Sequence, residues 1–440
     1  MAKRITVTAT GDALITRRLP AYRDDPFQRM VALIQSADAA FTNMEMVLSD
    51  YAGTPVVESG GINLSAEPAV ARDLQRLGFN LTAFANNHTL NYGEAGTLAT
   101  LRALDEMGLV CAGAGRHLAE ARMPAFLETA AGRIGLVACA STFAPGQRAG
   151  AQCAEVQGRP GLNPQRFDTL YVVDQEHMDA IQRIAERTGA ERQRQRRVWM
   201  GFGPPPKREG EFMFADRSFI VGPEFRIKTE PHPQDLDENL RSVRHAREVA
   251  DLVLVSIHAH EQGAERWQPA DFIVEFAHAC VDAGADMIIG HGPHLLRGLE
   301  LYNGKPVFYS LGNFIFQAEY LRRVPADDYE TLRIDPGCSP AELFRQVSQN
   351  DTRSFPADRH YWETVLPLCT FEGRELRELR LYPLSLGFGQ PWPDRGTPRL
   401  ADSPIAGEVL RWMAELSAPF GTRIGIDEGV GHVPVAGSGV

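Results

Sequence analysis

The chain has 440 residues, of which 44% are hydrophobic and 23% are charged, so it can bury a large core without disulfides. Its formal net charge of −11 disfavours binding to nucleic acid or to an anionic membrane surface. The six cysteines form no Cys-x-x-Cys pair, which fits a reducing compartment. The N-terminal sequence MAKRITVTATGD has no signal-peptide pattern and no apolar run of membrane-spanning length follows, so we expect a cytoplasmic protein without a membrane partner.

Short β-rich runs alternate with helical patterns, which predicts an α/β fold. In the first part of the chain we expect strands over 5–9, 39–42, 81–85 and 110–112, helices over 26–36, 68–77 and 95–107, and a hairpin-like pair over 124–129 and 134–140. The pattern resumes with strands over 252–257, 287–289 and 307–310, a helix over 271–283, and a late strand pair over 364–371 and 377–382.

Three stretches depart from this alternation. Residues 145–233 carry an arginine-rich helical stretch followed by GFGPPPKREG, and we interpret them as an insertion that could act as a lid. Residues 320–360 are predicted to be an irregular insertion, and residues 386–440 a C-terminal extension with one helix near 405–416 and a flexible tail. The catalytic core is therefore expected over 1–144 and 234–385.

The arginines of the first insertion alternate with Glu191 and with glutamines in a chain that is acidic overall. This pattern favours a solvated helix face over a nucleic-acid site.

Polar residues that suit metal binding follow several predicted strands. They are Asp12, Glu45, Asn87, His88, His258, His291 and His294. In open α/β sheets the carboxyl ends of the strands meet at one crevice, so these residues can form one site. Mixed carboxylate, amide and imidazole ligands suit Mn²⁺, Fe²⁺ or Zn²⁺, and we expect one or two such ions to activate a water. His260 lies two positions after His258, on the same face of a strand, and could be a further ligand or a substrate contact.

Each of these residues also has an ordinary structural explanation when taken alone. Asp12 could be a turn residue, Asn87 could cap a helix, and His291 and His294 could lie in a loop. Together they favour a functional site. We interpret Gly312-Asn313 as a structural turn.

Five motifs resemble a known family. They are GDALITR (11–17), NMEM (43–46), ANNHTLNYGEAG (85–96), GHGPHLLRGLE (290–300) and YSLGNFIF (309–316). With the stretch 113–138, they resemble the CapA-type poly-γ-glutamate biosynthesis family, a branch of the calcineurin-like metallophosphatase superfamily. The resemblance implies a four-layer α/β sandwich around two mixed β-sheets.

The resemblance also implies roles for the candidate residues. Asp12 and His294 would hold one metal, Asn87, His258 and His291 the second, with Glu45 as a bridge and His88 as the general acid. The chain differs from the family pattern at three positions, Leu14, Asn91 and Gly292. It also differs in the tripeptide His258-Ala259-His260. Asn43 and Asn91 are therefore considered as additional ligands or substrate contacts.

The candidate metal ligands predict a metal-dependent hydrolase. The family resemblance implies that it acts on an amide or related C–N bond of a small-molecule or peptide-like substrate, which could resemble glutamate. A phosphoesterase and a non-catalytic accessory protein of anionic polymer assembly are alternatives, and a lyase or isomerase is a weaker one. The oligomeric state stays open.

Overall fold

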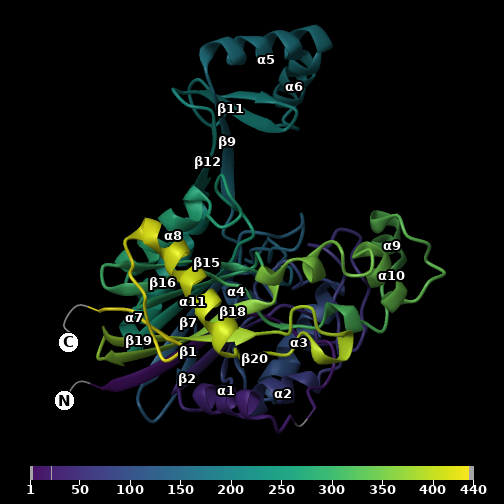
Figure 1. Cartoon of the computed structure of the whole chain (residues 1–440). Helices are drawn as coiled ribbons and strands as arrows, with labels where there is room; N and C mark the ends of the chain where they lie inside the picture. Colours follow the sequence, from purple (N-terminus) through teal and green to yellow (C-terminus); the bar gives the residue numbers. More distant parts are fainter. Residues whose placement is uncertain (1–2, 21, 436–440) are drawn as a thin grey trace.

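The computed structural model describes residues 3–20 and 22–435, and its centre is a pair of stacked mixed β-sheets (Figure 1). The ten-stranded sheet consists of β1 (Arg4–Leu14), β2 (Ala39–Met44), β3 (Leu81–Ala83), β4 (Val110–Ala112), β17 (Asn313–Phe316), β18 (Glu363–Glu372), β19 (Glu375–Ser385), β20 (Arg399–Leu400), β21 (Gly425–Asp427) and β22 (Val430–His432). The six-stranded sheet consists of β6 (Ala125–Glu128), β7 (Arg133–Ala140), β13 (Leu252–His258), β14 (Met287–His291), β15 (Leu296–Tyr302) and β16 (Lys305–Leu311).

Most central strands bury both faces, which explains their nearly continuous apolar sequences. In β13, Leu252 and Leu254 pack between the two sheets, whereas Val253 and Val255 face outward against helices. The neighbouring strands β7, β13, β14 and β16 are parallel to one another. Their carboxyl ends therefore lie at one edge of the sheet.

Helices cover the outer faces of both sheets. The ten-stranded sheet packs against α1 (Asp25–Gln35), α2 (Val70–Leu77) and α3 (Gly93–Glu106). The six-stranded sheet packs against α7 (Pro233–Val249) and α8 (Asp271–Asp282). These layers confirm the predicted four-layer α/β sandwich around two mixed sheets.

The described part of the predicted extension, residues 386–435, contributes to this core. Helix α11 (Ser403–Ser417) buries Val409, Leu410 and Met413 in the cluster between the sheets, and β20, β21 and β22 join the ten-stranded sheet. The final residues of the predicted tail, 436–440, lie outside the described residues.

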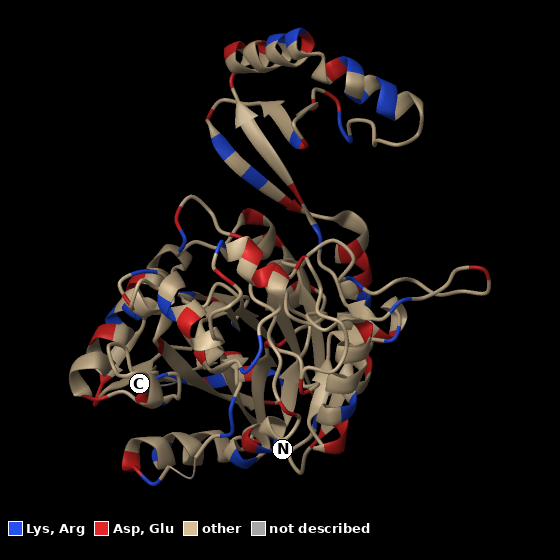
Figure 2. Cartoon of the chain, turned by 90° about the vertical axis from the view of Figure 1, so that its right-hand side faces the viewer, with Lys and Arg blue, Asp and Glu red and all other residues tan. Residues whose placement is uncertain are grey.

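The insertion predicted over 145–233 has two parts. Residues 167–231 form an arm that projects from the body (Figures 1 and 2). The elements of the arm are β9 (Phe167–Val173), α5 (Gln175–Thr188), α6 (Ala190–Trp199), β10 (Phe212–Phe214), β11 (Arg217–Val221) and β12 (Arg226–Pro231). Helix α6 contains no buried residue, as expected for a solvated arginine-rich helix. Residues 145–166 stay on the body, where Gln147 Nε2 donates to the Asn87 carbonyl oxygen at 3.1 Å.

The segment 320–360 is more regular than its sequence predicts. It contains α9 (Ala326–Leu332) and α10 (Pro340–Val347), which have seven and eight residues. Helices this short show too few turns for a periodic apolar pattern to stand out. Among the described residues, no helix combines the length and apolar character needed to cross a membrane.

Strand β1 is longer than predicted, and this corrects the placement of Asp12. The strand continues to Leu14, so Asp12 lies within it rather than beyond it, next to a register shift between Ala9 and Asp12. Gly11 makes this possible, because a Cβ at this position would overlap the Gly312 carbonyl oxygen. The Asp12 amide donates to that same oxygen at 2.9 Å. The close approach of two glycines therefore sets the position of Asp12.

We predict that Gly11→Ala lowers the free energy of unfolding by about 1–3 kcal/mol, because the added methyl group forces backbone apart. Urea unfolding followed by circular dichroism measures this. Gly407→Ala in α11 is the control, since the nearest atom to its new Cβ is the end of the flexible Arg411 side chain, at 3.2 Å. The control should lose no stability. A Gly11→Ala protein as stable as the original would contradict the prediction.

Candidate metal centre

A buried polar cluster lies where β1, β2, β13 and β14 end. Its carboxylates and imidazoles form two groups, Asp12 with His258 and His291, and Glu45 with His260 and His294. Within each group, one ligand atom of every residue lies within 4.8 Å of the others. Asp12, Glu45 and His258 have no exposed surface. The structure thus brings together all five of the predicted carboxylate and histidine ligands, with His260.

His258 belongs to the first group and also contacts the second. Its Nδ1 atom is 3.0 Å from His291 Nδ1, and its Nε2 atom is 3.0 Å from His260 Nε2. Its Nε2 atom is also 3.6 Å from Glu45 Oε1. This grouping differs from the one implied by the family resemblance, which joined Asp12 to His294 and placed His258 and His291 with Asn87.

The carboxylate of Glu45 is buried without a hydrogen-bond partner on either oxygen. Burial raises the pKa of this carboxyl well above its usual value, and the charge of Asp12 raises it further. Burying an unpaired carboxylate costs much free energy, so such groups are normally paired with a cation. The orphaned oxygens, together with the surrounding imidazoles, fit a divalent cation.

Asp12 is held in its ionised form. Burial by itself favours the neutral acid, but hydrogen bonds and charges from His291 and His294 keep the pKa of Asp12 well below its usual value. The carboxylate also accepts hydrogen bonds from Asn43 Nδ2 at 2.8 Å and from the Gly292 amide at 3.0 Å. Asn43 Oδ1 in turn accepts from Asn86 Nδ2, so both ends of the Asn43 amide are engaged. In the structure Asn43 positions Asp12.

Asn313 orients His294, a role that the sequence analysis missed. Asn313 Nδ2 donates to the carbonyl oxygens of His294 and Tyr361, which leaves Oδ1 to accept from His294 Nδ1 at 2.9 Å. The other ring nitrogen of His294, Nε2, lies 3.6 Å from Glu45 Oε1. Asn313 is the first residue of β17, separated by one residue from the end of β16, so it is not the turn residue predicted, and its place near a strand end was the available signal. Ser256 Oγ similarly contacts His291 Nε2 at 2.7 Å.

The Asn87-His88 pair lies beside the cluster, after β3. Asn87 Nδ2 donates to the Gly60 carbonyl oxygen at 3.0 Å, which leaves Asn87 Oδ1 without a partner and available to a cation. His88 Nδ1 lies 2.7 Å from Asn91 Oδ1. That oxygen also accepts from the Leu64 amide, so it must be the amide oxygen. His88 therefore carries its proton on Nδ1 and its lone pair on Nε2.

Burial lowers the pKa of His88 to about 4, so its imidazole is neutral at neutral pH. Asn91 has no exposed surface, and its side-chain oxygen contacts Nδ1 of His88. Like Asn43, it positions a neighbouring side chain.

His260 occupies space next to Gly292. A Cβ on Gly292 would lie 2.9 Å from His260 Cδ2, and the φ of Gly292 is +118°, which disfavours other residues. A side chain at position 292 would therefore displace the imidazole at position 260 and crowd the Ala259 backbone nitrogen, which lies 3.0 Å from the same Cβ. Burial lowers the pKa of His260 to about 3, so its imidazole is neutral and has one unprotonated nitrogen that can bind a cation.

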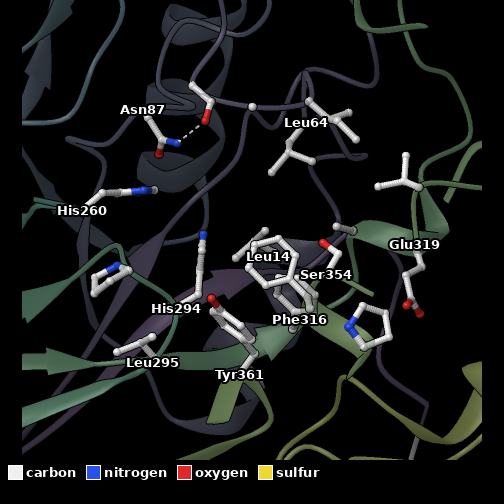
Figure 3. Close-up of a pocket in the computed structure, with 18 of the residues that line it drawn as sticks. Leu14, Leu64, Asn87, His260, His294, Leu295, Phe316, Glu319, Ser354 and Tyr361 are labelled. Atoms are coloured by element: carbon white, nitrogen blue, oxygen red, sulfur yellow. Dashed lines mark hydrogen bonds between the residues drawn. The ribbon is translucent and has the colours of Figure 1, made fainter. Parts of the chain in front are cut away.

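A cavity of about 460 Å³ opens onto this cluster (Figure 3). His88, His260, His294 and Asn87 line its inner end, and the remaining walls come mainly from 60–64, 293–295, 316–319 and 344–361. The described residues of 145–233 contribute none of the lining. The lid role of that segment stays a prediction.

Buried carboxylates and imidazoles at the strand ends of a four-layer α/β sandwich define a candidate centre for divalent metal ions. The family model described as "Bacterial capsule synthesis protein PGA_cap" matches residues 6–318. The chain belongs to this family, as its motifs predict.

Three known proteins are similar to the chain. The uncharacterized protein y4sH of Sinorhizobium fredii is 36% identical over 443 residues, which cover 97% of this chain and 92% of that protein. The capsule biosynthesis protein CapA of Bacillus anthracis is 24% identical over 327 residues, covering 73% of this chain and 62% of CapA. A solved hypothetical protein from Thermus thermophilus is 13% identical with a TM-score of 0.37, covering 87% of this chain and 99% of its own. So distant a structural likeness says nothing about activity.

We predict that cation binding releases a proton from Glu45. Because the pKa of Glu45 is raised, the metal-free protein keeps that proton to a higher pH than an exposed glutamate does, and affinity for the cation rises with pH until Glu45 ionises without it. Calorimetric titration of metal-free protein with Mn²⁺ in two buffers of different ionisation enthalpy counts the protons. Glu45→Gln should release about one proton fewer. Equal release by both proteins would contradict the prediction.

Proposed function

We propose that the protein is a metal-dependent hydrolase that cleaves an amide or related C–N bond of a small or glutamate-like substrate. The main support is the unpaired Glu45 carboxylate, which lies within a cluster of imidazoles that borders a cavity. One or two ions of Mn²⁺, Fe²⁺ or Zn²⁺ bound there would activate a water and stabilise negative charge on the substrate oxygen.

The cluster offers two sets of ligands for such ions. Asp12, His258 and His291 would hold one ion, and Glu45, His260 and His294 would hold the other. The free Oδ1 atom of Asn87 would add an amide oxygen. The mixed nitrogen and oxygen donors suit these borderline cations.

His88 is the proton carrier in this proposal. Its Nε2 atom carries the lone pair, so His88 first accepts the proton of the attacking water and then donates it to the leaving nitrogen. In this proposal His88 acts first as a general base and then as the general acid that the family resemblance implied. Asn91 holds the ring in the tautomer that this requires.

Two observations favour an amide over a phosphoester. The chain's motifs resemble proteins of poly-γ-glutamate biosynthesis, and that polymer is joined by amide bonds. In addition, the only arginine that lines the described cavity, Arg266, is paired with Asp358 at 2.7 Å, so it is not free to hold a phosphate. A cytoplasmic location and the lack of nucleic-acid and membrane partners stay predictions.

A non-catalytic role in polymer assembly is the second candidate, favoured by the family's description as a capsule synthesis protein. In that case the cluster would bind a cation but no chemistry would follow. A phosphoesterase is the third candidate.

We predict that His88→Gln lowers kcat for amide hydrolysis about 10²- to 10⁴-fold while the metal content stays unchanged, since His88 transfers protons. The assay measures 4-nitroaniline release from a panel of acyl 4-nitroanilides by Mn²⁺-loaded protein, with elemental analysis of each variant. His245→Ala, at an exposed histidine of α7, is the control. Turnover of 4-nitrophenyl phosphates alone would support the phosphoesterase. Bound metal without turnover of either class would support the accessory role.

A further inference from the structure

The cavity beside the candidate metal centre is polar mainly at its inner end. There Asn87, His260 and His294 point toward one another (Figure 3), and His88 also lines the cavity. The walls beyond them are largely apolar and include Leu14, Ile62, Leu64, Pro293, Leu295, Phe316, Phe344, Val347 and Phe355. Their uncharged polar side chains are Gln262, Ser348, Ser354 and Tyr361. A ligand that reaches the cluster must therefore place its remaining atoms against hydrocarbon.

Apart from the imidazoles, the lining has two charged side chains, and both are already paired. Arg266 forms an ion pair with Asp358 at 2.7 Å and stacks over the ring of Trp267. Glu319 accepts from the buried Arg395, with Nε and Oε2 3.0 Å apart. Neither is free to balance a charge on a ligand. A carboxylate placed against the apolar part of these walls would lose its hydration without gaining a cationic partner.

The apolar wall reaches the reactive groups. The ring of Phe355 lies 5.5 Å from the ring of His294, and the ring of Phe316 lies 6.0 Å from it. On the other side, α10 presents Phe344 and Val347, three positions apart on one face of the helix. A ligand group next to His294 would therefore lie close to the Phe355 and Phe316 rings.

We infer that the substrate is a compact amide whose scissile bond adjoins an uncharged apolar group, such as a phenyl ring or a short alkyl chain. The inference rests on the proposed function and selects, between its two substrate types, the small one. A volume of about 460 Å³ accommodates a small molecule. A glutamate side chain would bring an unpaired carboxylate against the apolar wall.

Two product-like acids test the chemistry of the wall. Glutarate and 4-phenylbutyrate share a carboxylate and three methylene groups, and differ in ending with a second carboxylate or a phenyl ring. Calorimetry with Mn²⁺-loaded protein should show that 4-phenylbutyrate binds at least about tenfold more tightly, because only glutarate leaves a charge unpaired. Equal or tighter binding of glutarate, or binding of neither acid, would overturn the inference.

Substitutions on α10 locate the effect. Val347→Lys adds a cation to the wall and should reverse the preference, whereas Gln346→Lys adds the same charge to an exposed neighbouring position and should not change it. If Val347→Lys does not fold, Phe344→Ala replaces it and should weaken 4-phenylbutyrate binding while leaving glutarate unchanged. An unaltered preference in both wall variants would overturn the inference.

Turnover separates this inference from the proposed function. The matched substrates are the 4-nitroanilides of 4-phenylbutyrate and of the γ-carboxyl of glutamate. Preferred binding of 4-phenylbutyrate without cleavage of any amide would refute the hydrolase and leave the apolar site standing. Faster cleavage of the γ-glutamyl compound would overturn the apolar substrate and leave the hydrolase standing.

Discussion

The buried carboxylate of Glu45 is the group on which the rest of the site depends. Both of its oxygens lack hydrogen-bond partners, and the ionised Asp12 is close enough to raise its pKa. Four imidazoles surround the two carboxylates, and burial keeps His258 and His260 neutral. A divalent cation would stabilise carboxylates and imidazoles packed this closely, so the cluster, the hydrogen bonds that orient its side chains and the cavity beside it have one common explanation.

The sandwich supplies the rigidity that this cluster needs. Asp12, His258 and His291 belong to strands that are buried on both faces, and the Gly11–Gly312 approach fixes where β1 passes its neighbours. Asn43, Asn91 and Asn313 then set the orientation of Asp12, His88 and His294 through hydrogen bonds. The walls of the cavity come largely from less regular segments instead, so the ligands and the substrate surface have separate structural origins.

The sequence pattern predicted the central strands and the carboxylate and histidine cluster, because apolar runs such as 252–257 end in polar residues that suit metal binding. The sandwich followed from the resemblance to a known family. It could not predict what depends on contacts between distant positions. Asn313 reads as a turn residue until its partner His294 is known. Phe344 and Val347 lie in a helix of eight residues with little periodicity, and nothing in the sequence indicates that they face the cluster.

The contact between Gly292 and His260 carries a consequence for related chains. The two positions are 32 residues apart and belong to different strand ends, yet they compete for one volume. A relative with a larger residue at 292 needs a smaller one at 260, so the two positions should covary across an alignment. An imidazole next to the cluster can then be supplied from either strand end, and a motif search confined to one of them would overlook the chains that supply it from the other.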